Sequence, residues 1–176
     1  MRGWFMRDKP RPDWIAVDWG TTALRAWAVV GGAYFPLGHL PRGMNSLRPG
    51  EFEGALQDLL DSAQDFDLSL PLDVIACGMV GARQGWVEAP YAHVPCPPLA
   101  PGLVKAPTTT PGLDVRIVPG LAQRNPADVM RGEETQVAGF LALNPGWDGV
   151  LVLPGTHSKW VAVSAGEVTG FRTAMT

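Results

Sequence analysis

The apolar positions of the first forty residues fall in short runs separated by turn residues. Residues 14–18 form an apolar run that ends in an acid, and residues 24–30 alternate in part between apolar and polar side chains. Gly31 and Gly32 form a hairpin turn signal before a third apolar run over residues 33–37. Because such alternation bounded by turn residues is typical of strands, the pattern predicts an antiparallel meander of three strands.

The middle of the chain combines one helical pattern with two buried runs. Residues 51–65 carry apolar side chains at the spacing of an amphipathic helix. Residues 73–77 form an apolar run that stops at Gly78, and residues 115–118 form another, so both runs predict strands. Residues 86–114 are dense in proline and glycine and predict a long irregular loop.

A second helix is predicted over residues 126–143. Asn125 is suited to its N-cap, and Pro126 is suited to its first position. The helix is expected to end at Asn144, which is followed by proline and glycine.

The opening pattern of the chain recurs after this helix. Residues 149–153 and 159–163 predict two strands joined by a Gly-Thr turn, and residues 168–171 predict a third strand. Since the order of strands and turns repeats that of the first meander, the sequence predicts two related domains. We assign residues 14–143 to the first domain and residues 147–176 to the opening strands of the second.

The composition excludes several classes of protein. With 46% apolar and 18% charged residues, the 176-residue chain can bury a core, which excludes disorder throughout. A net charge of −3 argues against electrostatic binding of nucleic acid, and no apolar run approaches the length of a membrane helix. The two cysteines, Cys77 and Cys96, exclude a disulfide scaffold and fit a cytoplasmic protein. Residues 1–13 are basic and contain proline, and are expected to form a loose tail.

Two short turns carry residue types that bind phosphate and metal ions. Asp18 stands at a strand end, where it can hold Mg²⁺ directly or through water. Gly20 lets backbone N–H groups approach an anion, and the hydroxyls of Thr21 and Thr22 can donate to phosphate oxygens. Taken alone, this segment also fits an ordinary polar turn. The second Gly-Thr turn, at Gly155, favours a phosphate site gripped from two sides.

Three further stretches make the resemblance to one family close, namely residues 76–91, 128–136 and 153–161. Together with the DxGTT turn they resemble the 2-dehydro-3-deoxygalactonokinases, which are sugar-acid kinases of the actin/hexokinase/Hsp70 superfamily. The resemblance implies an α/β fold of ribonuclease H-like domains, each with a mixed sheet, an opening meander and flanking helices. It implies phosphorylation, by ATP with Mg²⁺, of the 6-hydroxyl of 2-dehydro-3-deoxygalactonate in galactonate catabolism. Family members are longer, so we expect the second domain to be cut off at Thr176.

The resemblance also implies roles for the two turns. Asp18 is the expected partner of Mg²⁺, through water. Arg25 can reach phosphate, although a solvated strand residue is the alternative. Strand alternation can point Lys159 outward. The expected contacts with ATP and its phosphates are Asp18, Gly20, Thr21, Thr22, Arg25, Gly155, Thr156, His157 and Lys159.

The sugar acid is expected at the segment that follows the strand over residues 73–77, since open α/β sheets bind ligands beyond strand ends. Arginine is suited to bidentate recognition of a carboxylate, amide and carboxylate groups bind hydroxyls, and aromatic rings pack on carbon faces. An ordinary surface loop with one ion pair is the alternative. The expected substrate contacts are Arg83, Gln84, Trp86, Glu88 and Tyr91.

Two adjacent acids are candidates for the base that takes the proton of the sugar hydroxyl. Glu133 and Glu134 point about 100° apart on a helix, so they cannot share one role. We favour Glu134 slightly. A pair of solvated helix acids is the alternative, and Asp128 is a competing candidate.

Other functions remain open from the sequence. A catalytically incompetent fragment could retain a sugar-acid pocket and lack an ATP site. A phosphatase-like relative is a third class, against which the Arg83–Trp86 loop argues. The exposed sheet edge of an incomplete second domain would favour self-association.

Overall fold

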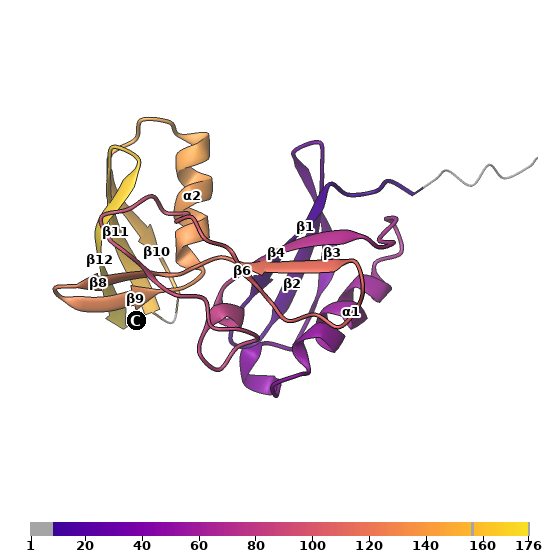
Figure 1. The fold of residues 1–176 in the computed structure, drawn as a ribbon. Coiled ribbons are helices and arrows are strands. Elements are labelled where there is room, and N and C mark those ends of the chain that lie inside the picture. Colours follow the sequence, from indigo (N-terminus) through magenta and orange to yellow (C-terminus); the bar gives the residue numbers. More distant parts are fainter. Residues whose placement is uncertain (1–8, 156, 176) are drawn as a thin grey trace, which may run out of the picture.

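The chain forms a mixed α/β fold of two groups of strands, each with one α-helix (Figure 1). The computed structural model describes residues 9–155 and 157–175. The first group is a six-stranded sheet in the order β3-β2-β1-β4-β7-β6. Its elements are β1 (Trp14–Trp19), β2 (Leu24–Val30), β3 (Ala33–Leu40), β4 (Leu72–Cys77), β6 (Val104–Lys105), β7 (Leu113–Ile117) and helix α1 (Phe52–Ser62).

The alternation of β1 places every second side chain in the core on one face of this sheet, whereas the edge strand β3 is largely exposed. Ile15, Val17 and Trp19 are buried on β1 and belong to one core with Leu56 and Leu59 of α1. Burying a leucine side chain stabilises a fold by about 1.5–3 kcal/mol, so this helix contributes strongly to stability. The predicted meander is confirmed, because β1, β2 and β3 pair antiparallel in chain order.

The parallel strands of the sheet bring three strand ends to one edge. β4 pairs parallel with β1 and with β7. Asp18 at the end of β1 therefore lies in register with Cys77 at the end of β4. The first short 3₁₀ turn, η1 (Met44–Ser46), precedes α1, and the second, η2 (Met79–Gly81), follows β4.

The second group of strands contains two small sheets. β5 (Ala92–His93), β8 (Leu121–Arg124) and β9 (Ala127–Met130) form one sheet in that order. The other contains β10 (Gly149–Leu153), β11 (His157–Ser164) and β12 (Glu167–Met175). Helix α2 (Glu133–Leu143) lies beside β10 and β11 (Figure 1), and its Val137 shares a core with Val161 and Val163. The predicted second meander is confirmed by the antiparallel pairing of β10 with β11 and of β11 with β12.

The helix predicted over residues 126–143 is wrong in its first part. Asn125 and Pro126 form the turn between β8 and β9, so they neither cap nor open a helix. The Gln123 side chain holds this turn, since it donates to the Pro126 carbonyl and accepts from the backbone N–H of Phe171 on β12. The helix begins only at Glu133, after a left-handed Gly132 with φ of 108°.

The loop predicted over residues 86–114 is also less irregular than expected. It contains the two short strands β5 and β6, and β7 begins before it ends. In the part of the chain that the structure describes, neither helix is long and apolar enough to cross a membrane.

Glu53 in the first turn of α1 binds the segment over residues 86–114 to this helix. Its carboxylate accepts the backbone N–H groups of Thr109 and Thr110 at 2.8 Å and the Thr109 hydroxyl at 3.0 Å. Although desolvation opposes the shift, hydrogen bonds from Thr110 and Thr109 lower the pKa of Glu53 to about 2.

The Glu53 contact predicts a loss of stability in acid. A carboxyl whose pKa is lowered by folding contributes stability above its unfolded value of 4.5, and this contribution falls away toward pH 2. We expect Glu53→Gln to lower the free energy of unfolding at pH 7 by about 1–2 kcal/mol, as for lost charged hydrogen bonds. Urea unfolding between pH 2 and pH 7 tests this, with Glu167→Gln on the exposed surface as control. An unchanged pH slope in Glu53→Gln would contradict it.

Candidate active site

A cavity of about 460 Å³ lies between the two groups of strands. The six-stranded sheet contributes its strand ends and the first Gly-Thr turn, and the second group contributes the turn between β10 and β11. The segment that leads into α2 forms a third wall. Of the residues expected at a site, the lining includes Asp18, Gly20, Thr21, Glu133, Gly155 and His157.

The first turn is held from behind by η1. The backbone N–H groups of Met44 and Asn45 donate to the carbonyls of Gly20 and Thr21 at 3.0 and 3.1 Å. A Cβ at Gly43 would lie 2.3 Å from the backbone nitrogen of Thr22, so no other residue fits there without movement. The turn is therefore a rigid support for whatever the cavity binds.

Asp18 and Arg25 face each other across β1 and β2. They are register partners, and Arg25 Nη1 lies 3.0 Å from Asp18 Oδ2. Both side chains are about half exposed, so this ion pair contributes little to stability. Asp18 lines the cavity, whereas Arg25 is not among its lining residues and contacts the Asp18 carboxylate from outside it.

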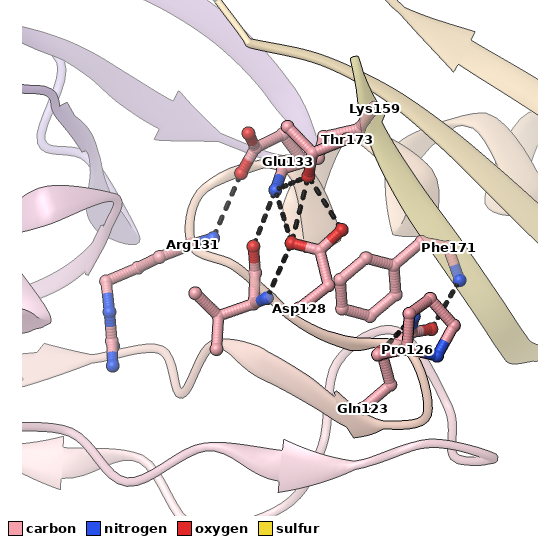
Figure 2. Close-up of polar contacts among 9 residues, drawn as sticks. Gln123, Pro126, Asp128, Arg131, Glu133, Lys159, Phe171 and Thr173 are labelled. Carbon is pink, nitrogen blue, oxygen red and sulfur yellow. Dashed lines mark hydrogen bonds and ion pairs between the residues drawn. The ribbon is translucent and has the colours of Figure 1, made fainter. Parts of the chain in front are cut away.

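The second turn brings Gly155 and His157 to the same cavity. Thr156, also expected at phosphate, lies outside the described residues. Lys159 does not line the cavity and is only 6% exposed. Its ammonium donates to the Val129 carbonyl, to Thr173 Oγ1 and to Asp128 (Figure 2).

Lys159 was expected at phosphate and Asp128 was a candidate base, whereas the structure pairs the two with each other. Three oxygens occupy the lysine's three donors, so its charge fastens β9 to β11 and β12. Asp128 lies on β9 and accepts from Thr173 at 2.7 Å. Although desolvation opposes it, hydrogen bonds from Thr173 and Val129 together with Lys159 lower the pKa of Asp128. An ionised carboxylate fully engaged in this way is a poor proton acceptor.

The two adjacent glutamates at the start of α2 have different environments. Glu133 is partly exposed and lines the cavity, and its Oε2 accepts the backbone N–H of Arg131 at 3.0 Å (Figure 2). Glu134 is completely buried, and its Oε2 accepts the backbone N–H of Gly132 at 2.7 Å. Glu134 Oε1 has no hydrogen-bond partner among the described residues. Desolvation by burial raises the pKa of Glu134 to about 7.

Two left-handed glycines bring the walls of the cavity together. Gly78 follows β4 and Gly132 precedes α2, with φ values of 92° and 108°. A Cβ on Gly132 would lie 3.4 Å from the Cα of Gly78, and a Cβ on Gly78 would lie 2.7 Å from the Trp19 carbonyl oxygen. The backbones therefore approach each other directly behind Asp18 and Glu133.

The expected substrate residues do not line this cavity. Arg83, Gln84 and Glu88 are exposed on the segment that follows η2. Trp86 is half-buried and stacks on Phe52, with ring centroids 6.1 Å apart. The Trp86 ring is therefore part of the core that α1 covers.

Tyr91, the remaining expected substrate contact, packs against Arg131, which was not expected at the site from the sequence. The guanidinium carbon of Arg131 lies 4.3 Å from the centre of the Tyr91 ring. Arg131 lines the cavity and is 8% exposed. It stands inside the stretch over residues 128–136 that carries the family resemblance, which was a usable signal.

Cys77, Gly78, Thr135 and Gln136 are further lining residues that were not expected at the site. Burial raises the pKa of Cys77 to about 12, so its thiol stays protonated and does not act as a nucleophile at neutral pH. Thr135 donates its hydroxyl to the Gly132 carbonyl at 2.5 Å and so completes the turn before α2. The reactive groups of the cavity are therefore its carboxylates, His157 and hydroxyls.

Comparison with known proteins gives a consistent set of matches. The family model for 2-keto-3-deoxy-galactonokinase matches residues 18–176. A probable 2-dehydro-3-deoxygalactonokinase of Rhizobium meliloti (strain 1021) is 43% identical over 169 residues. The 2-dehydro-3-deoxygalactonokinase of Escherichia coli (strain K12) is 35% identical over 165 residues. Each match covers 93% of this chain and 53% of the relative, so the chain spans about half the length of the curated relatives it matches.

A solved structure agrees with these matches. The crystal structure of a protein assigned as a 2-dehydro-3-deoxygalactonokinase from Sinorhizobium meliloti is similar to this chain with a TM-score of 0.80 and 38% identity. The similarity covers 92% of this chain and 53% of that chain.

The raised pKa of Glu134 predicts how stability depends on pH. A carboxyl whose folded pKa is about 7 stabilises the fold fully below its unfolded value of 4.5, and this contribution is lost as pH rises toward 7. We expect thermal unfolding of the chain to move to lower temperature between pH 5 and pH 8. Glu134→Gln keeps an acceptor for Gly132 and should flatten this dependence. The partly exposed Glu133→Gln is the matched control, and an equal flattening in both variants would contradict the assignment.

Proposed function

Because this chain belongs to the 2-keto-3-deoxy-galactonokinase family, we propose that it takes part in phosphoryl transfer from ATP to the 6-hydroxyl of 2-dehydro-3-deoxygalactonate. The relatives are named as sugar-acid kinases, and the substrate and cofactor carry over from them as part of this proposal. The reaction belongs to galactonate catabolism. The two free cysteines fit a reducing, cytoplasmic setting.

One observation carries this proposal, namely that two Gly-Thr turns from separate sheets meet at one cavity. Gly20 and Thr21 lie on one wall, Gly155 and His157 on another, and Glu133 between them. Phosphoryl transfer depends mainly on positioning and on neutralising charge, which is what two opposed backbone turns supply. A domain that only bound the sugar acid would not need the turn at Gly155 to line the same cavity.

The residues at the first turn fit a nucleotide with Mg²⁺. Magnesium is usually bound through one or two carboxylates, phosphate oxygens and water, and Asp18 supplies a carboxylate in the cavity wall. The ion would lower the charge of the phosphates. Thr21 and Thr22 would donate to phosphate oxygens, and Arg25 would keep Asp18 oriented through their ion pair. Thr156 is proposed as a further contact with phosphate.

For the proton of the sugar hydroxyl, the geometry supports Glu133 more than Glu134. Glu133 lines the cavity, whereas Glu134 is completely buried behind it. We assign Glu133 as the base and Glu134 as a group that fixes the turn before α2. The sugar-acid contacts Arg83, Gln84, Glu88 and Tyr91 remain proposals, and they require the segment that carries them to adjoin the cavity. Trp86 supports that segment from the core.

The domain assignment is also part of this proposal. We assign the six-stranded sheet with α1 to a ribonuclease H-like domain, and β10–β12 to the opening meander of a second, similar domain. The alternative is that the 176-residue chain binds the sugar acid without catalysing transfer. Because the chain spans about half the length of its relatives, sugar-acid binding and ATP binding are best tested separately. Self-association through the exposed edge strand β10 would be seen in the same preparations.

Calorimetric titration of the 176-residue chain with 2-dehydro-3-deoxygalactonate, and separately with ATP and Mg²⁺, tests the proposal. We expect both ligands to bind. Asp18→Asn should weaken ATP binding roughly tenfold or more, because it removes a carboxylate from the metal, and should leave sugar-acid binding unchanged. Asp114→Asn is the matched control, since Asp114 is paired with Arg116 in the same sheet and does not line the cavity.

Each other outcome has a definite meaning. Sugar-acid binding without ATP binding would favour the non-catalytic alternative. Binding of neither ligand by a folded chain would contradict the proposal. Equal effects of Asp18→Asn and Asp114→Asn on ATP would contradict the role of Asp18.

A further inference from the structure

Arg131 is a buried cation that lines the cavity and whose side chain contacts a distant segment of the chain. Its Nη2 donates to the Ala89 carbonyl at 2.8 Å, and its guanidinium lies over the Tyr91 ring. A Cβ at Gly81 would lie 2.8 Å from Arg131 Nη1, so the absence of a side chain there makes room for it. The hydrogen bond, the ring contact and the space at Gly81 all involve residues 81–91, which lie about forty to fifty positions earlier in the chain.

The backbone of Arg131 belongs to the turn that carries both candidate carboxylates. Its N–H donates to Glu133 Oε2, and the N–H of the next residue, Gly132, donates to Glu134 Oε2. One residue thus joins this turn to the segment proposed to contact the sugar acid. We call the contacts of Arg131 with Ala89 and Tyr91, together with the space that Gly81 leaves for its side chain, the Arg131 latch.

Burying this cation is costly, which argues that the latch has a role. Nε and Nη1 are buried without a hydrogen-bond partner among the described residues. Buried charges are normally paired and fully hydrogen-bonded, and an arginine on the surface would keep its water. The planar guanidinium is nevertheless well suited to this place, since it can stack on a ring and donate in its own plane.

We propose that Arg131 is a positioning residue for sugar-acid binding, which holds residues 81–91 against the turn of Glu133 and Glu134. The proposal rests on the proposed function, since it assumes that the sugar acid binds between this segment and the cavity. Without the latch, Arg83, Gln84 and Glu88 would lose their fixed distance from Glu133. In this proposal Arg131 acts through these residues; because its side chain also lines the cavity, direct contact with the sugar acid is the outcome that would overturn it.

Arg131→Met and Arg131→Lys test the latch. The first keeps an apolar stem, and the second keeps a charge without the planar fork. Calorimetry with 2-dehydro-3-deoxygalactonate separates affinity from the folded fraction, because unfolding lowers the stoichiometry whereas lost positioning raises Kd. For Arg131→Met we expect about a tenfold rise in Kd at unchanged stoichiometry, the size of one lost desolvated cation–π contact. Lysine should restore only part of the affinity, and Tyr91→Leu should resemble Arg131→Met.

Hydrogen exchange separates a loosened segment from a general loss of stability. In the ligand-free chain, exchange should become faster at the amides of Trp86 and Ala89 in Arg131→Met, whereas the amides of β11 stay protected. The first two amides donate to the carbonyls of Val80 and Gly81, so they report on the segment directly. Arg124→Met is the matched control, because Arg124 is exposed on β8 and should change neither Kd nor exchange.

The neutral primary amide of the sugar acid distinguishes positioning from direct recognition. A latch weakens the acid and the amide equally, and a weakening confined to the acid would overturn the proposal in favour of direct contact with the carboxylate. A fall in stoichiometry with unchanged Kd would overturn it in favour of a purely structural role. If the unaltered chain binds no sugar acid, the proposed function fails, and unchanged exchange in Arg131→Met would then refute the latch independently.

Discussion

The close approach of two glycine backbones sets the distance between the walls of the cavity. Gly78 directly follows β4 and Gly132 directly precedes α2, and both have left-handed φ values. A side chain on Gly78 would collide with the Trp19 carbonyl, which directly follows Asp18. A Cβ on Gly78 would require movement, and the φ of 108° at Gly132 is strained for any other residue. Both glycines stand where Asp18 and Glu133 reach the same cavity from elements more than one hundred residues apart.

The approach of Gly78 and Gly132 fixes the cavity because further contacts hold the elements on each side of it in place. On one side, the parallel pairing of β1 with β4 places Asp18 beside Cys77, and the η1 turn supports Gly20 and Thr21. On the other side, Lys159, Asp128 and Thr173 fasten β9 to β11 and β12 (Figure 2). β9 leads into α2, and β11 follows the turn at Gly155. Charged groups that do not face the cavity thus determine where its lining residues lie.

Much of this arrangement could be predicted from the sequence, and the failures have physical causes. Alternation identified both meanders, since their middle strands β2 and β11 bury several side chains, although the edge strands β3 and β10 are largely exposed. Residues 126–132 were mistaken for helix because Pro126 suits a first turn, whereas the Gln123 side chain, bonded to Pro126 and Phe171, favours a hairpin. Local sequence does not contain that distant partner. For the same reason the burial of Lys159 and the position of Arg131 over Tyr91 were not predicted.

The two glutamates show how neighbouring residues of one type can have different chemistry. Glu133 lines the cavity, and its carboxylate accepts one backbone N–H, that of Arg131. Glu134 is desolvated, and its raised pKa means that it titrates near neutrality. A base needs both a suitable pKa and access to the proton it removes, and access comes first. Glu134 is buried away from the cavity, whereas Glu133 lines it. The raised pKa of Glu134 is therefore better explained as a cost of packing the turn than as preparation for catalysis. Their order along α2 therefore matters as much as their chemistry, because a helix directs only one of two adjacent side chains into a given cavity.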